Sequence, residues 1–233
     1  MPDACRQAQA PVRVAKSCFN FRVYSTVLTL YDDMISGNGY KVRLMLSQLR
    51  IPFRYMPVDV VAGETRTPQF LAINPNGQIP VIMLEDGRTL SQSNAILLYF
   101  AEETPLLPRD RFARAEVNQW LFFEQYSHEP YIAVLRFWHH LPGGPDRAQQ
   151  ARLPQMLDKG NAALRVMNTH LSDKRFLVGD RYSIADIALY AYTHVADEGG
   201  FDLRRFPHVR DWLARIRELP GHIAIDTACG VSA

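Results

Sequence analysis

The spacing of hydrophobic and polar residues changes near residue 104. Between residues 27 and 104, short runs of β-branched and aromatic residues alternate with helical spacings. From residue 112 to residue 226, only helical spacings occur. The change predicts an α/β domain at 27–104 and an all-α domain at 112–226, joined by a proline-containing linker at 105–111.

Strands and helices alternate in the first part. A strand is predicted at 27–31, and the turn-forming run at 36–39 can cap the helix that follows it. A second strand is predicted at 53–61, where Pro57 favours a position at the edge of a sheet, and a short helix follows at 67–72. The helix after the run 36–39 has apolar residues at i, i+3, i+4 and i+7: Val42, Met45, Leu46 and Leu49.

A loop and a hairpin complete the first part. The loop at 74–80 is rich in Asn, Pro and Gly, which favour turns. Residues 81–90 form a predicted hairpin with Asp86 and Gly87 at its tip, and residues 91–94 begin a third helix. The order is βαβαββα. Because a β-α-β unit joins parallel strands and a hairpin joins antiparallel ones, we expect a four-stranded mixed sheet.

Helical patterns fill the second part. A Pro-Gly-Gly-Pro loop at 142–145 separates two of them, and Ser183 and Asp186 have the spacing of a capping box. A last helix begins near Pro207. An aromatic-rich stretch has two interpretations, core and dimer interface or the lining of a hydrophobic substrate pocket. Its residues are Trp120, Phe123, Tyr126, Tyr131, Phe137 and Trp138.

Charge and composition exclude several classes of partner. The 233 residues include 26 basic and 24 acidic ones, spread along the chain, so the net charge is only +2. No block of like charge suggests a nucleic-acid tail or an anionic membrane patch, and no apolar run approaches the roughly 18 residues of a membrane span. We therefore expect no nucleic-acid and no membrane partner, and a small ligand instead.

The cysteines and the N-terminus indicate the compartment. Cys5, Cys18 and Cys229 lie near the ends of the chain, without the spacing of a disulfide framework or a zinc site. This usage suits a reducing, cytoplasmic environment, and we expect no metal. Residues 1–26 are basic but lack the apolar centre of a secretory signal. A transit peptide is one interpretation; we favour a disordered extension, with a short tail at 227–233.

Three segments of the first part should meet at one edge of the sheet. Ligands of open α/β sheets lie beyond the carboxyl ends of the parallel strands. The run 36–39, the loop 78–80 and the helix start at 92–93 all lead to that edge. Two helix N-termini present free N–H groups and positive dipole ends there. The arrangement suits a small anionic ligand that carries carboxylates.

These segments resemble a known family. The runs 36–43, 74–80, 91–96, 124–130 and 177–186 are similar, in that order, to the motifs of bacterial cytosolic glutathione S-transferases. The turn that holds Ser36 and Asn38 resembles that of the nu-class-like glutathione-dependent disulfide reductases. The resemblance extends over about residues 28–222. It implies a thioredoxin-like N-terminal domain, an all-helical C-terminal glutathione-transferase domain, a homodimer, and glutathione as cosubstrate.

The resemblance also implies catalytic residues. Ser36 would donate a hydrogen bond from its hydroxyl to the glutathione sulfur, and Asn38 would assist from two residues further on. A free thiol has a pKa of about 8.5, and each unit by which the pKa falls needs about 1.4 kcal/mol. One hydrogen bond to a charged acceptor supplies about 1.5–3 kcal/mol, so Ser36 could lower the thiol pKa by one or two units. Alternatively, Ser36 and Asn38 only cap the helix.

The remaining family positions imply contacts with the tripeptide. Ile79, before a predicted cis-Pro80, would pair its backbone with the cysteinyl part. Gln92 and Ser93 would hold the γ-glutamyl carboxylate. Gln78 would reach the glycine end. Because many relatives have Lys at this last position, the glutamine lacks their charge-assisted contact.

Other polar and aromatic residues carry less weight. Tyr31 falls inside the strand pattern, so we interpret it as a packing residue. His128 with Glu129, and His139 with His140, lack the spacing of a metalloprotease site, and we expect surface or packing roles for them.

Three functions remain open at this stage. The leading one activates the glutathione thiol as a thiolate for attack on a small hydrophobic electrophile. The second is cysteine-free, glutathione-dependent reduction of disulfides. The third is a non-catalytic module that binds glutathione.

Overall fold

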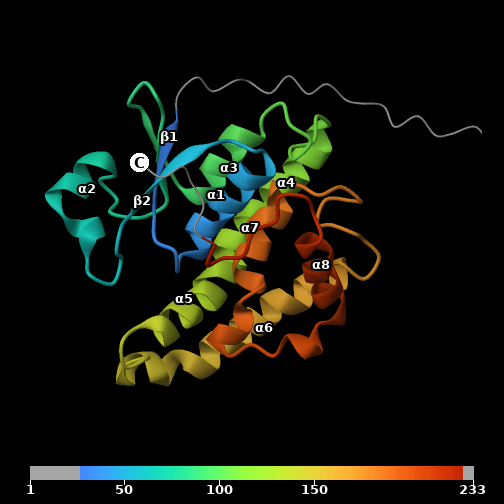
Figure 1. Cartoon of the computed structure of the whole chain (residues 1–233). Helices are drawn as coiled ribbons and strands as arrows, with labels where there is room; N and C mark the ends of the chain where they lie inside the picture. Colours follow the sequence, from blue (N-terminus) through green and yellow to red (C-terminus); the bar gives the residue numbers. More distant parts are fainter. Residues whose placement is uncertain (1–26, 228–233) are drawn as a thin grey trace, which may run out of the picture.

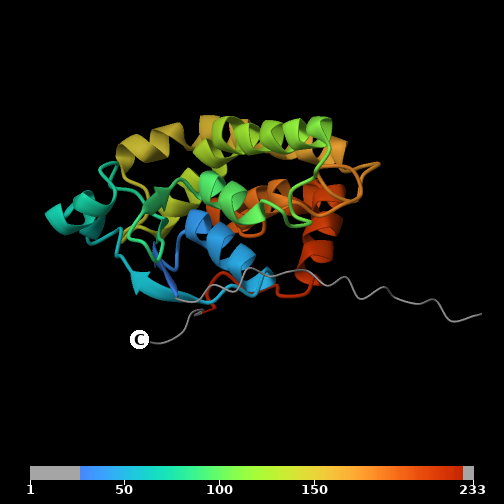
Figure 2. The same ribbon diagram turned by 90° about the horizontal axis from the view of Figure 1, so that it is seen from above.

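The computed structural model describes residues 27–227. The expectations for the extension at 1–26 and for the three cysteines fall outside this range. The strands and α2 lie at one side of the molecule and α8 at the other, with α1 and α3 between the sheet and the other helices (Figure 1, Figure 2). The element order βαβαββα, followed by helices, confirms the predicted fold class.

The sheet has four strands in the order β2-β1-β3-β4. Strand β1 (Leu28–Asp32) is parallel to β2 (Phe53–Pro57) and antiparallel to β3 (Val81–Met83), which pairs with β4 (Thr89–Ser91) as a hairpin. The mixed sheet, the edge position of β2 and the hairpin are therefore confirmed.

The second strand is shorter than the predicted 53–61. Its register with β1 ends where Asp32 faces Pro57. Beyond that pair there is no neighbouring strand, and the amide of Val60 donates instead to the Asp33 side chain at 3.1 Å. The chain then turns into the 3₁₀ segment η1 (Glu64–Arg66).

The helices of the first domain begin close to the predicted positions. Helix α1 (Gly37–Gln48) buries the four apolar residues of its predicted pattern, and α2 (Pro68–Ile73) starts one residue later than expected. Helix α3 (Ser93–Ala101) follows the hairpin. Helices α1 and α3 contact each other and both contact α7, so they connect the sheet with the second domain.

The second domain is helical throughout, and its bounds are as follows. It comprises α4 (Arg111–Phe123), the π-helical segment η2 (Glu124–His128), α5 (Glu129–His140), α6 (Arg147–His170), α7 (Ile184–Thr193), the 3₁₀ segments η3 (Ala196–Gly199) and η4 (Leu203–Arg205), and α8 (Pro207–Arg217). Helix α4 starts at Arg111, one residue inside the predicted linker, because Asp110 caps it by accepting from the Ala113 amide at 2.9 Å.

The predicted capping box at the start of α7 is confirmed, and it reaches beyond its own helix. The Asp186 carboxylate accepts from the amides of Ser183 and Leu177 and from the Trp212 indole, each at 2.9 Å. Burial raises the pKa of Asp186 to about 6, while these donors oppose the rise. All residues of α7 are buried, so this helix is the centre of the second domain.

The segment after α8 returns to the first domain. The Tyr40 hydroxyl donates to the Ile223 carbonyl at 2.7 Å, and the Arg43 guanidinium donates to the Ile225 carbonyl at 2.6 Å. Both side chains belong to α1. The end of the described chain is thus bonded to the first helix.

Candidate functional site

The three predicted segments line one cavity of about 620 Å³. Ser36 and Asn38 reach it from the start of α1, residues 78–80 from the loop, and residues 92–93 from the start of α3. The second domain supplies the opposite wall, with Gln125, Glu129, Ala133, Val134, Arg136, Phe137, His140 and Tyr192. The structure therefore brings together all seven predicted site residues, whose roles toward a ligand stay predictions.

The start of α1 is a capped helix terminus that opens into the cavity. The Ser36 hydroxyl oxygen accepts from the Gly39 amide at 3.1 Å, so the capping interpretation is confirmed for Ser36; the Asn38 side chain bonds to Glu129 and Ser93 instead. The proton of this hydroxyl has no acceptor among residues 27–227, so it is available to a ligand. The Arg136 guanidinium, from α5, donates to the Ile35 carbonyl just before the cap. The second domain therefore supports the backbone of the turn.

Beneath this turn lies a fully buried ion pair. Arg43 donates to Asp32 at 3.0 Å, and neither side chain is exposed. Burial raises the pKa of Asp32 to about 7, against the lowering effect of Arg43. A Cβ atom at Gly39 would lie 1.5 Å from a carboxylate oxygen of Asp32. Only glycine therefore lets α1 begin this close to the end of β1.

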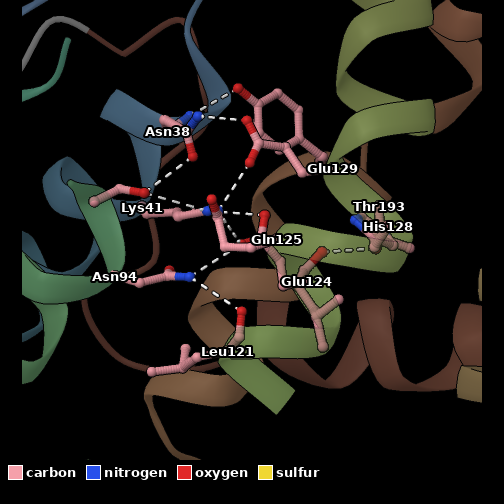
Figure 3. Close-up of polar contacts among 12 residues, drawn as sticks. Asn38, Lys41, Asn94, Leu121, Glu124, Gln125, His128, Glu129 and Thr193 are labelled. Carbon is pink, nitrogen blue, oxygen red and sulfur yellow. Dashed lines mark hydrogen bonds and ion pairs between the residues drawn. The ribbon is translucent and has the colours of Figure 1, made fainter. Parts of the chain in front are cut away.

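Asn38 is held at three points (Figure 3). Its side-chain Nδ2 donates to Glu129 at 2.9 Å, and its Oδ1 accepts from the Ser93 hydroxyl at 3.0 Å. Its backbone amide donates to the Tyr192 hydroxyl at 3.1 Å. Since Glu129 and Tyr192 belong to the second domain, both domains fix the orientation of this asparagine.

Ser93 is largely buried, and its hydroxyl is engaged inside the protein. It donates to Asn38 and accepts from Lys41 Nζ at 3.3 Å. What the start of α3 offers to a carboxylate is its first-turn backbone N–H groups, which have no partner within the helix. The predicted γ-glutamyl contact of Ser93 would therefore come from its backbone N–H group, or from its hydroxyl after the hydrogen bond to Asn38 is broken.

Lys41 and Glu124 form a second buried ion pair, which joins the domains. The distance from Nζ to Oε1 is 2.9 Å, and both side chains are fully buried. The other oxygen of Glu124 accepts from Asn94 at 3.1 Å and from Gln125 at 2.7 Å (Figure 3). Buried charges of this kind are tolerated only when they are paired and hydrogen-bonded.

The π-helical segment η2 brings the acidic residues of this region together. The amide of Glu129 donates to the Glu124 carbonyl, one π turn earlier. Between them His128 is fully buried and lies 2.8 Å from the Thr193 hydroxyl. Burial lowers the pKa of His128 to about 4, so it is neutral and has the packing role that we expected. Such π turns are frequent at functional sites.

Glu129 is not a surface residue, and our expectation of a surface or packing role for it misses its place in the cavity wall. Lys41, Glu124, Gln125 and Tyr192 were also missed. The available signal was weak: Lys41 sits beside the apolar pattern of α1, and Glu124 sits within the aromatic stretch. The place of these two residues in the sequence does not indicate which residues their side chains contact.

The loop and the start of α3 have unusual backbone geometry. The Ile79–Pro80 peptide bond is cis, as predicted. The exposed Gln78 side chain accepts from Asn76 at 2.6 Å. Gln92 has φ of +70° and ψ of 108°, outside the regions that L-residues favour. Because such conformations concentrate at functional sites, the position of Gln92 in the cavity wall supports a role in binding.

The other aromatic residues divide between core, cavity and surface. Tyr31 packs edge-on against Phe70, which agrees with the packing interpretation. In the aromatic stretch, Trp120 and Trp138 are buried and Phe137 lines the cavity. Tyr126 is 79% exposed. The core interpretation therefore holds for the two tryptophans, while a dimer interface and a substrate pocket stay predictions.

Residues 35–103 match the N-terminal domain of glutathione S-transferases, and residues 131–220 match the C-terminal domain of the same family. The chain belongs to the glutathione S-transferase family. A crystal structure of a glutathione S-transferase from Pseudomonas fluorescens Pf-5 is 49% identical, with a TM-score of 0.81, over 86% of this chain and 99% of that one. The N-terminal domain of this transferase family is thioredoxin-like and the C-terminal domain is helical, as predicted.

Three further relatives bear on function. The disulfide-bond oxidoreductase YfcG of Escherichia coli K12 is 32% identical, over 78% of this chain and 87% of that protein. A glutathione transferase from Burkholderia graminis is 29% identical, with a TM-score of 0.71, over 84% of this chain and 85% of that one; its structure holds two glutathione molecules per subunit. Protein URE2 of Candida albicans is 30% identical, and the match spans 82% of this chain but 67% of that protein.

Neither a metal centre nor a membrane span is found in the described part of the chain. Within residues 27–227, no three His, Cys, Asp or Glu side chains are grouped so that they could hold a metal ion. Over the same residues, no helix has both the length and the apolar character that crossing a membrane requires.

The buried pair between the domains gives a stability prediction. Lys41→Met should lower the free energy of unfolding by about 3–5 kcal/mol, because it leaves the Glu124 charge buried without a partner. Adding Glu124→Gln should restore most of the loss. Urea unfolding of both single variants and the double variant measures this coupling. Arg114→Ala, which breaks an exposed pair with Glu102, is the control and should change nothing measurable. A Lys41→Met variant as stable as the parent would contradict the assignment.

Proposed function

We propose that this member of the family binds glutathione in the cavity and ionises its thiol for attack on a hydrophobic electrophile. One observation carries the proposal: the capped start of α1, the cis-Pro80 loop and the start of α3 face the same cavity. Two helix N-termini favour an anionic ligand. The relative from Burkholderia graminis supports glutathione as that ligand.

Ser36 is the proposed donor to the sulfur. Its hydroxyl oxygen already caps α1, while its proton is free for a ligand. A hydrogen bond to a thiolate contributes about 1.5–3 kcal/mol. Because residues 27–227 contain no cysteine, the attacking sulfur in this site comes from the ligand.

The wall supplied by α5 is the proposed place of the second substrate. Ala133, Val134 and Phe137 line it and offer an apolar surface close to Asn38. An electrophile with an apolar body would bury that body there, and burial of apolar surface contributes about 25 cal/mol per Å².

Disulfide reduction is the second candidate, and the similarity to YfcG favours it. In that chemistry, glutathione thiolate attacks one sulfur of a disulfide, and the other sulfur leaves as a thiolate that takes up a proton. A second glutathione thiolate then attacks the glutathione sulfur of the mixed disulfide, which gives oxidised glutathione and releases the remaining substrate sulfur as a thiolate that also takes up a proton. Two bound glutathiones, as in the Burkholderia graminis structure, would suit this sequence of steps.

We also propose a homodimer. Phe122 is 66% exposed and Tyr126 is 79% exposed, four residues further along the same helical stretch. Large aromatic side chains are enriched where protein surfaces associate. A second copy of the chain that covers them would remove this apolar surface from water.

A comparison of two substrates distinguishes the candidate reactions. With glutathione present, an aryl chloride should be consumed if the protein is a transferase, and bis(2-hydroxyethyl) disulfide should be consumed if it is a reductase. Product formation with each, followed in parallel, gives the ratio of kcat/KM values. Turnover of the disulfide alone would exclude the transferase activity. Retention on immobilised glutathione without turnover of either substrate would indicate a binding module.

Replacement of the proposed donor tests the mechanism. Ser36→Ala should lower kcat/KM about 10- to 100-fold, because the thiolate loses a hydrogen bond worth about 1.5–3 kcal/mol. Glutathione affinity, measured by calorimetry, should change much less. The matched control is Asp110→Ala, which removes the cap of α4 away from the cavity and should leave kcat/KM unchanged. Unchanged turnover in Ser36→Ala would leave capping as the sole role of this serine.

The exposed aromatics test the dimer. Phe122→Asp together with Tyr126→Asp should shift the mass measured by light scattering from that of two chains to that of one, since charge is disfavoured in a dimer core. Val166→Asp, at a half-exposed apolar residue of α6, is the control and should remain dimeric. A double variant with the mass of two chains would place the interface elsewhere.

A further inference from the structure

Glu129 has a position that the proposed function does not use. Within residues 27–227 it is the only acidic residue that lines the cavity. It belongs to α5, and its carboxylate reaches Asn38 at the start of α1 (Figure 3). It therefore lies beside the place where the ligand thiol is proposed to ionise.

Neutral donors satisfy this carboxylate. One oxygen accepts from the Asn38 amide at 2.9 Å and the other from the Gln125 amide at 2.8 Å. The nearby cation, Lys41, is bonded to Glu124 at 2.9 Å. Burial raises the pKa of Glu129, and Lys41 opposes the rise. The charge of Glu129 is thus held without an ion pair of its own among the described residues.

The charges around the site constrain how a thiolate can form there. The titratable groups that interact with Glu129 are Lys41 from α1, Glu124 from η2 and Tyr192 from α7. The same cavity is also lined by Arg66, Arg136 and His140, and Arg136 is bonded to Glu198 and to the Ile35 carbonyl. Lys41 and Glu124 form an ion pair and act on Glu129 in opposite directions. Burial raises the pKa of Tyr192, so this phenol stays neutral. A thiolate beside an ionised Glu129 would place two like charges in one partly desolvated region, which raises the pKa of both groups.

We propose that Glu129 accepts the thiol proton of glutathione, an inference that rests on the proposed function. The S–H bond breaks, its electron pair stays on sulfur, and the proton forms an O–H bond on the carboxylate. The net charge of the region does not change, because the negative charge moves from Glu129 to sulfur. In disulfide exchange, the leaving thiolate takes this proton back; in transfer to an electrophile, the proton leaves to solvent after the reaction.

A count of protons against thiolates tests this transfer. Glutathione is titrated into the protein near neutral pH. The ultraviolet absorbance of the thiolate gives the thiolates formed, and calorimetry in two buffers of different ionisation enthalpy gives the protons released. S-methylglutathione, which has no thiol, provides the baseline. In the parent protein the ratio of released protons to thiolates should be near zero, and in Glu129→Gln it should be near one, with several-fold fewer thiolates.

Two further variants complete the design. Glu129→Asp keeps a carboxylate and should retain a low ratio of released protons to thiolates. This variant keeps the inference testable even if Glu129→Gln folds poorly. Glu218→Gln, at an exposed position after α8, should match the parent. A ratio of released protons to thiolates near one in the parent overturns the inference. A higher thiolate fraction in Glu129→Gln than in the parent also overturns it, because it would show that Glu129 only repels the thiolate. Absence of glutathione binding to the parent would overturn the proposed function itself.

Discussion

The pair between Lys41 and Glu124 is the constraint around which the cavity is organised. One partner comes from the first helix of the sheet domain and the other from the middle of the helical domain, and neither reaches water. Each charge is therefore stabilised by the other, and the pair orients the side chains that donate to it or accept from it. Ser93 and Asn94, at the start of α3, are bonded directly to this pair. The two domains share one site in which neither buried charge can lose its partner without a large loss of stability.

The π-helical segment explains how two glutamates serve one cavity. Glu124 and Glu129 are five residues apart, a spacing that the π turn accommodates. One of them neutralises the lysine, and the other holds Asn38. A regular α-helix would place the second carboxylate at a different angle to α1. The local widening of the helix thus places a carboxylate beside the asparagine.

Short-range patterns predicted much of this architecture. The cap at Ser36, the box at Ser183 and the hairpin tip at Gly87 each depend on residues a few positions apart, and all three are present. The family resemblance, rather than the spacing of any motif, indicated glutathione. The strand predicted at 53–61 was too long, because its β-forming residues continue after β1 has ended and no partner remains.

Long-range contacts could not be predicted in the same way. Lys41 and Glu124 are 83 positions apart, and Asn38 and Glu129 are 91 apart. A lysine in an amphipathic helix is ordinarily exposed, and nothing near it in the sequence indicates a buried carboxylate. The π segment was equally hidden, because η2 continues the aromatic pattern of α4. For these reasons the sheet-domain half of the cavity was predicted, while the wall opposite was described only as a set of aromatic residues.

The bonds from Tyr40 and Arg43 to the segment after α8 have a consequence for synthesis on the ribosome. The carbonyls of Ile223 and Ile225 are made 183 and 182 residues after the side chains of Tyr40 and Arg43, respectively. A nascent sheet domain therefore lacks these two carbonyl acceptors until the helical domain has been made, although Arg43 can already pair with Asp32. The helix capped by Ser36 is thus held in part by residues that do not line the cavity, so removal of Ile223 and the residues after it would weaken the attachment of α1.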